Sequence, residues 1–274
     1  MAYIPIIDQI DKLPPLPESA QKIESLFAQN SYPEINEVVN IIESDPALTT
    51  NILASANSPL YSFSKQIISI LQATTLFGSA MIRSMVLKSA LEENFEINMS
   101  AYNISNDDFA KVCAMQSTFV FQWYMGIDVE KSKMLVPMAF LMETGAILIS
   151  KDILDQNNED EFLEDLSSYQ EIRTAENIHV NMSTAQINTL LFEHWNFDKL
   201  FIETMRALDG ENEASSLINE LSLALRTIRT AVNLKEQFSE SSMKNAITLL
   251  EANHMDSKKF TTVAERIKRK FDLI

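Results

Sequence analysis

The sequence predicts an essentially all-α protein, and three observations carry this prediction. Glycine is scarce, at 4 of 274 residues, while 46% of the residues are hydrophobic. The chain therefore has few residues for tight hairpin turns and ample material for a core. No stretch alternates polar and apolar residues as a half-buried strand does. Apolar residues instead recur at helical spacing between residues that start or stop helices.

Proline and asparagine divide the N-terminal part of the chain into short helices. Three prolines in the stretch LPPLPES, residues 13–19, hold the backbone extended before a helix can begin. Asp45 and Pro46 fit the N-cap and first position of another helix, and Asn57-Ser58-Pro59 fits a helix stop. We expect helices at about 18–30, 35–43, 46–57, 67–76 and 79–93.

The polar stretch 96–106 is the expected boundary between two lobes of one multi-helix domain. The N-terminal helical lobe would be residues 1–97 and the second lobe residues 98–274. A long helix at about 107–124 carries Gln116 on its apolar face, where an amide needs partners or a function. Further helices are expected at about 171–178, 183–195, 198–208, 213–238, 239–253 and 257–271, with 126–132 as a linker and 152–165 as a solvated face or loop.

The second lobe is organised around the run MLVPMAFLMETGAILIS, residues 134–150, whose only charged residue is Glu143. A helix that is apolar on every side must be surrounded, so we expect one buried central helix. The run is too short for a membrane span. Pro137 would fall in or near the first turn, and Gly145 would suit close contact with a neighbouring helix.

Charge and cysteine content exclude several classes of function. The net charge of −16 repels phosphate backbones and anionic membrane surfaces, so nucleic acid is not expected as a partner. The N-terminus has no basic leader followed by an apolar run, and we expect no membrane span and a cytoplasmic location. The single cysteine, Cys113, has no partner for an internal disulfide.

Three stretches of the N-terminal part of the chain occur in an order that is typical of one family. They are LPPLPES at 13–19, ESDPALTTNILASANSPLYS at 43–62 and ISILQATTLFGSAMIRSMVL at 68–87. Together they resemble the HDOD domain of bacterial signalling proteins, a relative of the HD phosphohydrolases. The similarity continues more weakly through the central run and FEHWNF at 192–197. It implies an all-helical fold with an HD-like core and a role in bacterial regulation.

The resemblance also implies where an HD phosphohydrolase would hold its metal ions. Such a site needs His and Asp side chains from several helices, because divalent metals must polarise phosphate and activate water. At the positions of this chain that correspond to those metal ligands no imidazole occurs, and His179, His194 and His254 lie elsewhere in the sequence. We therefore expect no catalytic residue, no metal and no cofactor. The equivalent positions, which would line a remnant pocket open to a small molecule, are Gln116, Met142, Glu143, Thr184 and Asp209, with Leu208 before the last.

Two candidate sites each have a structural alternative. Glu143 and Gln116 either line that pocket, or Glu143 pairs with a buried Arg or Lys or reaches solvent at a cleft, while Gln116 caps a backbone group. We favour the second interpretation, since buried charges usually persist by being paired. Asn57, Ser58 and Tyr61 either form a recognition loop or a helix stop with a packed tyrosine, and we favour the helix stop.

The final helix combines a basic face with an apolar stripe, which includes Phe260, Ile267 and Phe271. It either docks onto an acidic partner or membrane surface, or packs on its own domain with its lysines solvated, which we favour. The candidate partner-binding residues of the whole chain are Asn57, Tyr61, Lys268, Arg269 and Lys270.

The sequence as a whole predicts a non-catalytic bacterial signal-transduction module that acts through protein–protein interaction. One alternative is a metal-dependent phosphohydrolase with a shifted ligand set, built from Glu143 and Asp209 with one of the remaining histidines. Another is a non-catalytic nucleotide sensor.

Overall fold

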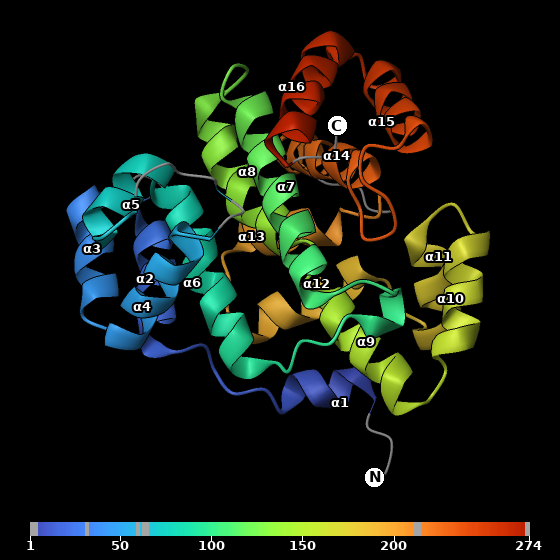
Figure 1. Cartoon of the computed structure of the whole chain (residues 1–274), viewed down its shortest axis with the longest axis horizontal. Helices are drawn as coiled ribbons and strands as arrows, with labels where there is room; N and C mark the ends of the chain where they lie inside the picture. Colours follow the sequence, from blue (N-terminus) through green and yellow to red (C-terminus); the bar gives the residue numbers. More distant parts are fainter. Residues whose placement is uncertain (1–4, 31–32, 59–60, 62–65, 211–214, 272–274) are drawn as a thin grey trace. The chain divides into compact units, whose positions relative to one another are not determined.

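The computed structural model describes residues 5–30, 33–58, 61, 66–210 and 215–271, and helices dominate these residues (Figure 1). No strand occurs in these described residues. Their one β-type pairing is an isolated antiparallel bridge between Val232 and Gln237. The chain forms two compact units, residues 13–96 and residues 1–12 with 97–274. The first helix therefore belongs to the larger unit, whereas we had expected residues 1–97 to form the N-terminal lobe.

In the residues that the structure describes, the smaller unit contains five α-helices, and their ends follow the local sequence signals. Asp45 accepts a hydrogen bond from the Leu48 amide at the start of one helix, and Ser69 accepts one from Gln72 at the start of the next. Gly78, at φ +80°, separates the last two helices, which meet at 119°. The helices are α2 (Glu18–Gln29), α3 (Ile35–Glu43), α4 (Pro46–Ala56), α5 (Ile70–Phe77) and α6 (Ser79–Asn94).

The larger unit contains the remaining helices. The N-terminal α1 (Ile6–Asp11) contacts α9 and α12, while α7 packs against both α8 and α16 (Figure 1). The other elements are the 3₁₀ helix η2 (Ser100–Tyr102), α7 (Asn106–Tyr124), α8 (Val129–Leu141), α9 (Gly145–Asp155), α10 (Glu159–Ser168), α11 (Ile172–Val180), α12 (Thr184–His194), α13 (Lys199–Arg206), α14 (Ser216–Ala231), α15 (Glu240–Ala252) and α16 (Ser257–Lys270).

The buried central run is two helices and not the single helix that we expected. Asp128 caps α8 by accepting from the Glu130 and Lys131 amides, so the helix starts earlier and Pro137 lies inside it. The chain then leaves the α-helix at residues 142–144, where the Thr144 amide donates to the Leu141 carbonyl three residues before it. The Ala146 and Ile147 amides donate in the same way to the carbonyls of Glu143 and Thr144. Residues 142–144 therefore form a turn, which leaves backbone N–H and C=O groups in the core without α-helical hydrogen bonds.

The run is buried, as its composition predicts. The stretch Val129–Asp155 is long and apolar enough to pass a test for a membrane span, but 89% of its most apolar window is buried inside the protein. Within the described residues it is thus a core element of the larger unit.

Three other segments differ from the sequence prediction. The acidic stretch 152–165 is not a loop, because it ends α9 and begins α10, which buries Phe162 and Leu166. The exposed Asp160, Glu161 and Glu164 form the solvated face that we expected as the other possibility. Most of the expected linker at 126–132 belongs to α8. The expected helix 213–238 ends at Ala231, and the isolated bridge closes a loop after it.

Candidate functional site

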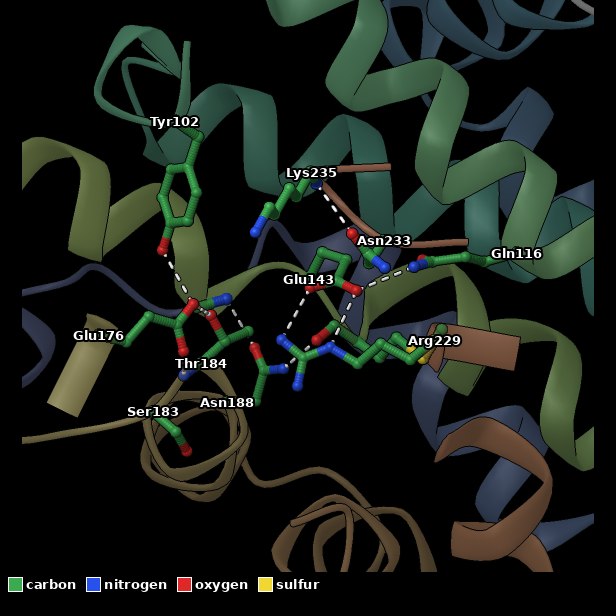
Figure 2. Close-up of polar contacts among 12 residues, drawn as sticks. Tyr102, Gln116, Glu143, Glu176, Ser183, Thr184, Asn188, Arg229, Asn233 and Lys235 are labelled. Atoms are coloured by element: carbon green, nitrogen blue, oxygen red, sulfur yellow. Dashed lines mark hydrogen bonds and ion pairs between the residues drawn. The ribbon is translucent and has the colours of Figure 1, made fainter. Parts of the chain in front are cut away.

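A buried ion pair lies at the break between α8 and α9 (Figure 2). Glu143 is fully buried, and the Arg229 guanidinium of α14 donates to both of its oxygens, from Nε to Oε1 and from Nη2 to Oε2, each at 3.0 Å. The Gln116 side chain of α7 donates to the same Oε1 at 2.8 Å. The carboxylate is therefore held by two helices, and the pairing that we expected for Glu143 is confirmed.

The Arg229 charge is stabilised by its acidic surroundings. Burial alone would lower the pKa of the guanidinium, but the charges of Glu143, Glu176 and Asp209 outweigh burial and raise the pKa above its ordinary value. The Arg229 side chain is 15% exposed. Arg229 is thus a fixed cation within the larger unit.

Gln116 has the capping role that we expected for it. Its Nε2 donates to the Val232 carbonyl at 2.9 Å as well as to Glu143. Val232 follows α14 directly, so its carbonyl is one of the groups that a helix end leaves unpaired. Gln116 therefore connects α7 to both the carboxylate and the end of α14.

Asn188 of α12 closes the break in the central run. Its Nδ2 donates to the Met142 carbonyl at 2.7 Å, and its Oδ1 accepts from the Gly145 amide at 2.7 Å. All three residues are buried. One amide side chain thus satisfies both backbone groups that the turn at residues 142–144 leaves in the core.

Gly145 permits the close approach that this clamp requires. A Cβ atom at Gly145 would lie 2.5 Å from the Thr184 carbonyl oxygen and 3.2 Å from Asn188 Oδ1. The contact with a neighbouring helix that we expected for Gly145 is therefore confirmed, and the neighbour is α12.

A second buried carboxylate, Glu176 of α11, lies beside the Arg229–Glu143 ion pair (Figure 2). It accepts from the Thr184 amide at 2.8 Å, from the Thr184 hydroxyl at 2.6 Å and from the Tyr102 hydroxyl at 2.9 Å. Burial raises the pKa of the Glu176 carboxyl, although the Arg229 charge and these hydrogen bonds act in the opposite direction. Burial and the adjacent Glu176 also raise the pKa of the Tyr102 hydroxyl.

Asp209 has different partners from the other residues of the expected remnant pocket. Its Oδ2 accepts from the Ser183 hydroxyl at 2.5 Å, and its carbonyl accepts from Arg173 at 3.1 Å. Asp209 is half-buried, whereas Thr184 is fully buried. The structure thus joins Gln116 to Glu143 directly, but it joins Thr184 to Glu176 and Asp209 to Ser183.

Sequence reasoning missed the basic partner and the second carboxylate of this site. Arg229 lies 86 residues from Glu143 in the chain, and only the buried charge of Glu143 signalled that such a partner must exist. Glu176 follows Ala175 on the buried side of a short helix, and no local apolar pattern marks it as buried.

The side chains present do not fit the divalent metal that an HD-type centre would need. A thioether, a neutral amide and a hydroxyl are poor ligands for such an ion, and both oxygens of Glu143 already contact a guanidinium. No group of three or more His, Cys, Asp or Glu suited to a metal occurs among the residues that the structure describes. His179 instead lies between Asp165 and Asn158, away from Glu143 in the α10–α11 pair.

The candidate partner residues of the smaller unit have local structural roles. The Asn57 side chain donates to the carbonyls of Leu53 and Ile67 and accepts from the Ile67 amide. Tyr61 is 8% exposed, and its ring meets the edge of Phe77 at a centroid distance of 4.8 Å. Both arrangements agree with the helix stop that we favoured.

The apolar stripe of α16 packs on its own unit, as we favoured. Phe260 is buried against the rings of Phe119 and Trp123 of α7. Lys268 pairs with Glu265 at 2.9 Å, and Lys270 lies 5.8 Å from the centre of the Phe271 ring. Arg269 is exposed.

The fold and the site define an all-helical domain with an HD-like core, in which a salt bridge lies where a metal centre would be expected. The chain belongs to the HDOD domain family, whose model matches residues 13–209.

Solved structures of several bacterial proteins are similar over nearly the whole chain. A virulence factor from Campylobacter jejuni is 26% identical, with a TM-score of 0.59 over 97% of this chain and 95% of that one. An HDOD domain protein of unknown function from Geobacter sulfurreducens is 16% identical, with a TM-score of 0.61 over 95% and 94%.

A third neighbour is larger than this chain. It is a candidate signal transduction protein from Marinobacter aquaeolei, 17% identical with a TM-score of 0.76, and the match covers 99% of this chain but 60% of that one. No curated protein matches the chain.

Proposed function

We propose that this chain is a non-catalytic signal-transduction module of the bacterial cytoplasm, which acts by binding another protein. The proposal is supported by membership in the HDOD family and by the likeness to a protein assigned to signal transduction. Such a function requires a stable helical scaffold and a surface that the partner protein can reach, and it involves no bond-breaking chemistry.

One observation carries the proposal, namely the ion pair between Arg229 and Glu143. A carboxylate that coordinates a catalytic metal must offer a lone pair to that metal. Here both oxygens of Glu143 accept hydrogen bonds from one guanidinium, and Gln116 contacts one of them as well. Glu143, which stands where an HD phosphohydrolase would hold its metal ions, therefore serves to neutralise Arg229.

The competing proposal is a phosphohydrolase, and one similar structure, from Shewanella amazonensis, is named as a candidate for that activity. That proposal requires Glu143 to exchange its guanidinium for a metal ion. Elemental analysis of the purified protein, with a hydrolysis screen over nucleotides and phosphoesters in Mg²⁺ and Mn²⁺, separates the two. We expect neither bound metal at stoichiometric level nor turnover.

The control for this screen is Glu143→Gln, which keeps the shape of the side chain and removes its charge. Stoichiometric metal together with turnover that disappears in Glu143→Gln would overturn the proposal, provided that circular dichroism shows the variant to be folded. A large thermal stabilisation by a nucleotide without turnover would instead support a sensor of small molecules.

A further inference from the structure

The exposed face of α16 concentrates positive charge on a strongly acidic protein. Lys258, Arg266 and Arg269 are all exposed, and the chain as a whole carries a net charge of −16. Among the described residues none of these three side chains forms an ion pair, and the nearby Glu265 pairs with Lys268. Three cations thus remain available on one side of one helix.

The opposite side of α16 fixes the orientation of this face. Phe260, Val263 and Ile267 are buried, and Phe260 packs on aromatic rings of α7. The Lys259 ammonium donates to the Gly126 carbonyl at the turn between α7 and α8. The cationic face therefore points away from the core, on a helix whose position is set by packing.

A shallow, open hollow follows the same face, and all the side chains that line it belong to α16. The spacing of the three cations corresponds to about 12 Å along the helix between Lys258 and Arg266 and about 4.5 Å between Arg266 and Arg269, at 1.5 Å per residue. The side chains that line the hollow are Ser257, Lys258, Thr261, Thr262, Glu265, Arg266 and Arg269, so hydroxyl groups lie between the charges.

We infer that this basic face of α16 is a docking surface for an acidic helical segment of a partner protein. Guanidinium groups bind carboxylates in a planar, two-bond geometry, and glutamates three or four residues apart on a helix match the spacing of Arg266 and Arg269. The inference rests on the proposed function, of which it names the surface and the chemistry of the partner.

Other occupants fit the face less well. A membrane-binding helix presents large apolar residues next to its cations, whereas α16 exposes none in the described part of the chain. Exposed apolar residues do occur at the neighbouring α7–α8 turn, among them Met125 and Ile127, so vesicle binding is included in the test. Nucleic acid carries a continuous array of phosphates, so the net charge of −16 repels it more strongly than it repels a short acidic segment.

The test is a binding titration with a synthetic helix. The probe is a fluorescent, capped alanine-glutamine peptide with glutamates at positions i, i+3, i+8 and i+11, which matches the face in either direction. Its isomer has the same composition with the glutamates distributed around the helix. We expect the patterned peptide to bind the full chain at low salt about tenfold more tightly than the isomer, with affinity falling as salt is raised.

The variant Arg266→Glu/Arg269→Glu is expected to weaken binding of the patterned peptide by about tenfold or more. Lys199→Glu/Lys244→Glu is the matched control, because it makes the same charge change at exposed lysines of α13 and α15. Equal weakening by both pairs would overturn the inference, since binding would then follow net charge alone.

Three further outcomes would also overturn it. They are equal binding of the two peptides, tighter Arg269-dependent binding to phosphatidylglycerol vesicles or to duplex RNA, and a dimer in light scattering that Arg266→Glu/Arg269→Glu dissolves. Equal binding of the two peptides would show that the face does not recognise the glutamate pattern, and each of the other outcomes would assign the face to a different occupant. Discovery of hydrolysis would defeat the proposed function but would leave the peptide result as it stands, so the two can fail separately.

Discussion

Arg229 and Glu143 form a two-bond salt bridge in the core of the larger unit, with both distances at 3.0 Å. The Glu143 side chain is completely buried, and the Arg229 side chain is 15% exposed. A buried charge is tolerated when its partner and its remaining hydrogen bonds are in place, and Gln116 supplies one of these bonds. The stability of the unit should therefore depend on the pair and not on either residue alone.

The first prediction concerns removal of one partner. Arg229→Met leaves the Glu143 carboxylate buried without its counter-charge, and we expect the free energy of unfolding in urea to fall by about 3–5 kcal/mol. Arg229→Met/Glu143→Gln removes both charges and should recover a large part of this loss. A double variant no more stable than the single one would contradict the interpretation.

The control for this cycle is Arg206→Met on α13. Arg206 pairs with Glu193 and Glu203 on the surface, where an ion pair contributes about 0–1 kcal/mol. The same chemical change should therefore have a small effect outside the core.

The second prediction concerns the approach of α9 to α12. In Gly145→Ala the new Cβ would lie 2.5 Å from the Thr184 carbonyl oxygen, a backbone atom that cannot rotate away. We expect a loss of about 1–3 kcal/mol in urea unfolding. Gly126→Ala is the control, because there the Cβ would meet only the flexible end of Lys259. Similar losses in the two variants would argue against a helix contact as the cause.

The third prediction concerns the clamp on the helix break. Asn188→Ala leaves the Met142 carbonyl and the Gly145 amide buried without partners, and each such group costs about 1–3 kcal/mol. Hydrogen exchange should show faster exchange of the amides at the start of α9 than in the wild type. Asn177→Ala, at an exposed amide of α11, is the control. Unchanged protection at α9 in Asn188→Ala would refute the clamp.

The fourth prediction is a pH dependence that arises from Glu176. Burial raises the pKa of this carboxyl in the folded protein, so the folded state binds the proton more tightly than the unfolded chain. This contribution to stability is present below the ordinary glutamate pKa and is lost as the pH rises through the raised folded pKa. Glu176→Gln has no such loss, so its stability relative to the wild type should increase as the pH rises above about 4.

Urea unfolding of both proteins at a series of pH values measures this difference. Glu164→Gln, which replaces an exposed carboxyl on α10, controls for the loss of any one glutamate. The prediction is wrong if the stability of Glu176→Gln relative to the wild type is flat, or changes with pH in the same way as that of Glu164→Gln.

The sequence was sufficient for most helix ends, because their signals are local. Pro46 after Asp45 begins α4, Gly78 separates α5 from α6, and the structure agrees with both. The interruption of the central run was not predictable in this way. Positions 142–144 contain no proline or glycine that would mark a helix end, and the side chain that stabilises the turn comes from Asn188, 46 residues from Met142.

The sequence by itself determined that this protein is helical, that it belongs with HDOD domains, and that a lone carboxylate in an apolar run needs a partner. The tertiary structure decided which partner that is, because burial and charge depend on residues that folding brings together. Arg229, 86 residues from Glu143, reads as an ordinary basic residue of α14 until the fold places it in the core. A helix pattern reports contacts within a few residues, whereas an ion pair between helices exists only once those helices have packed.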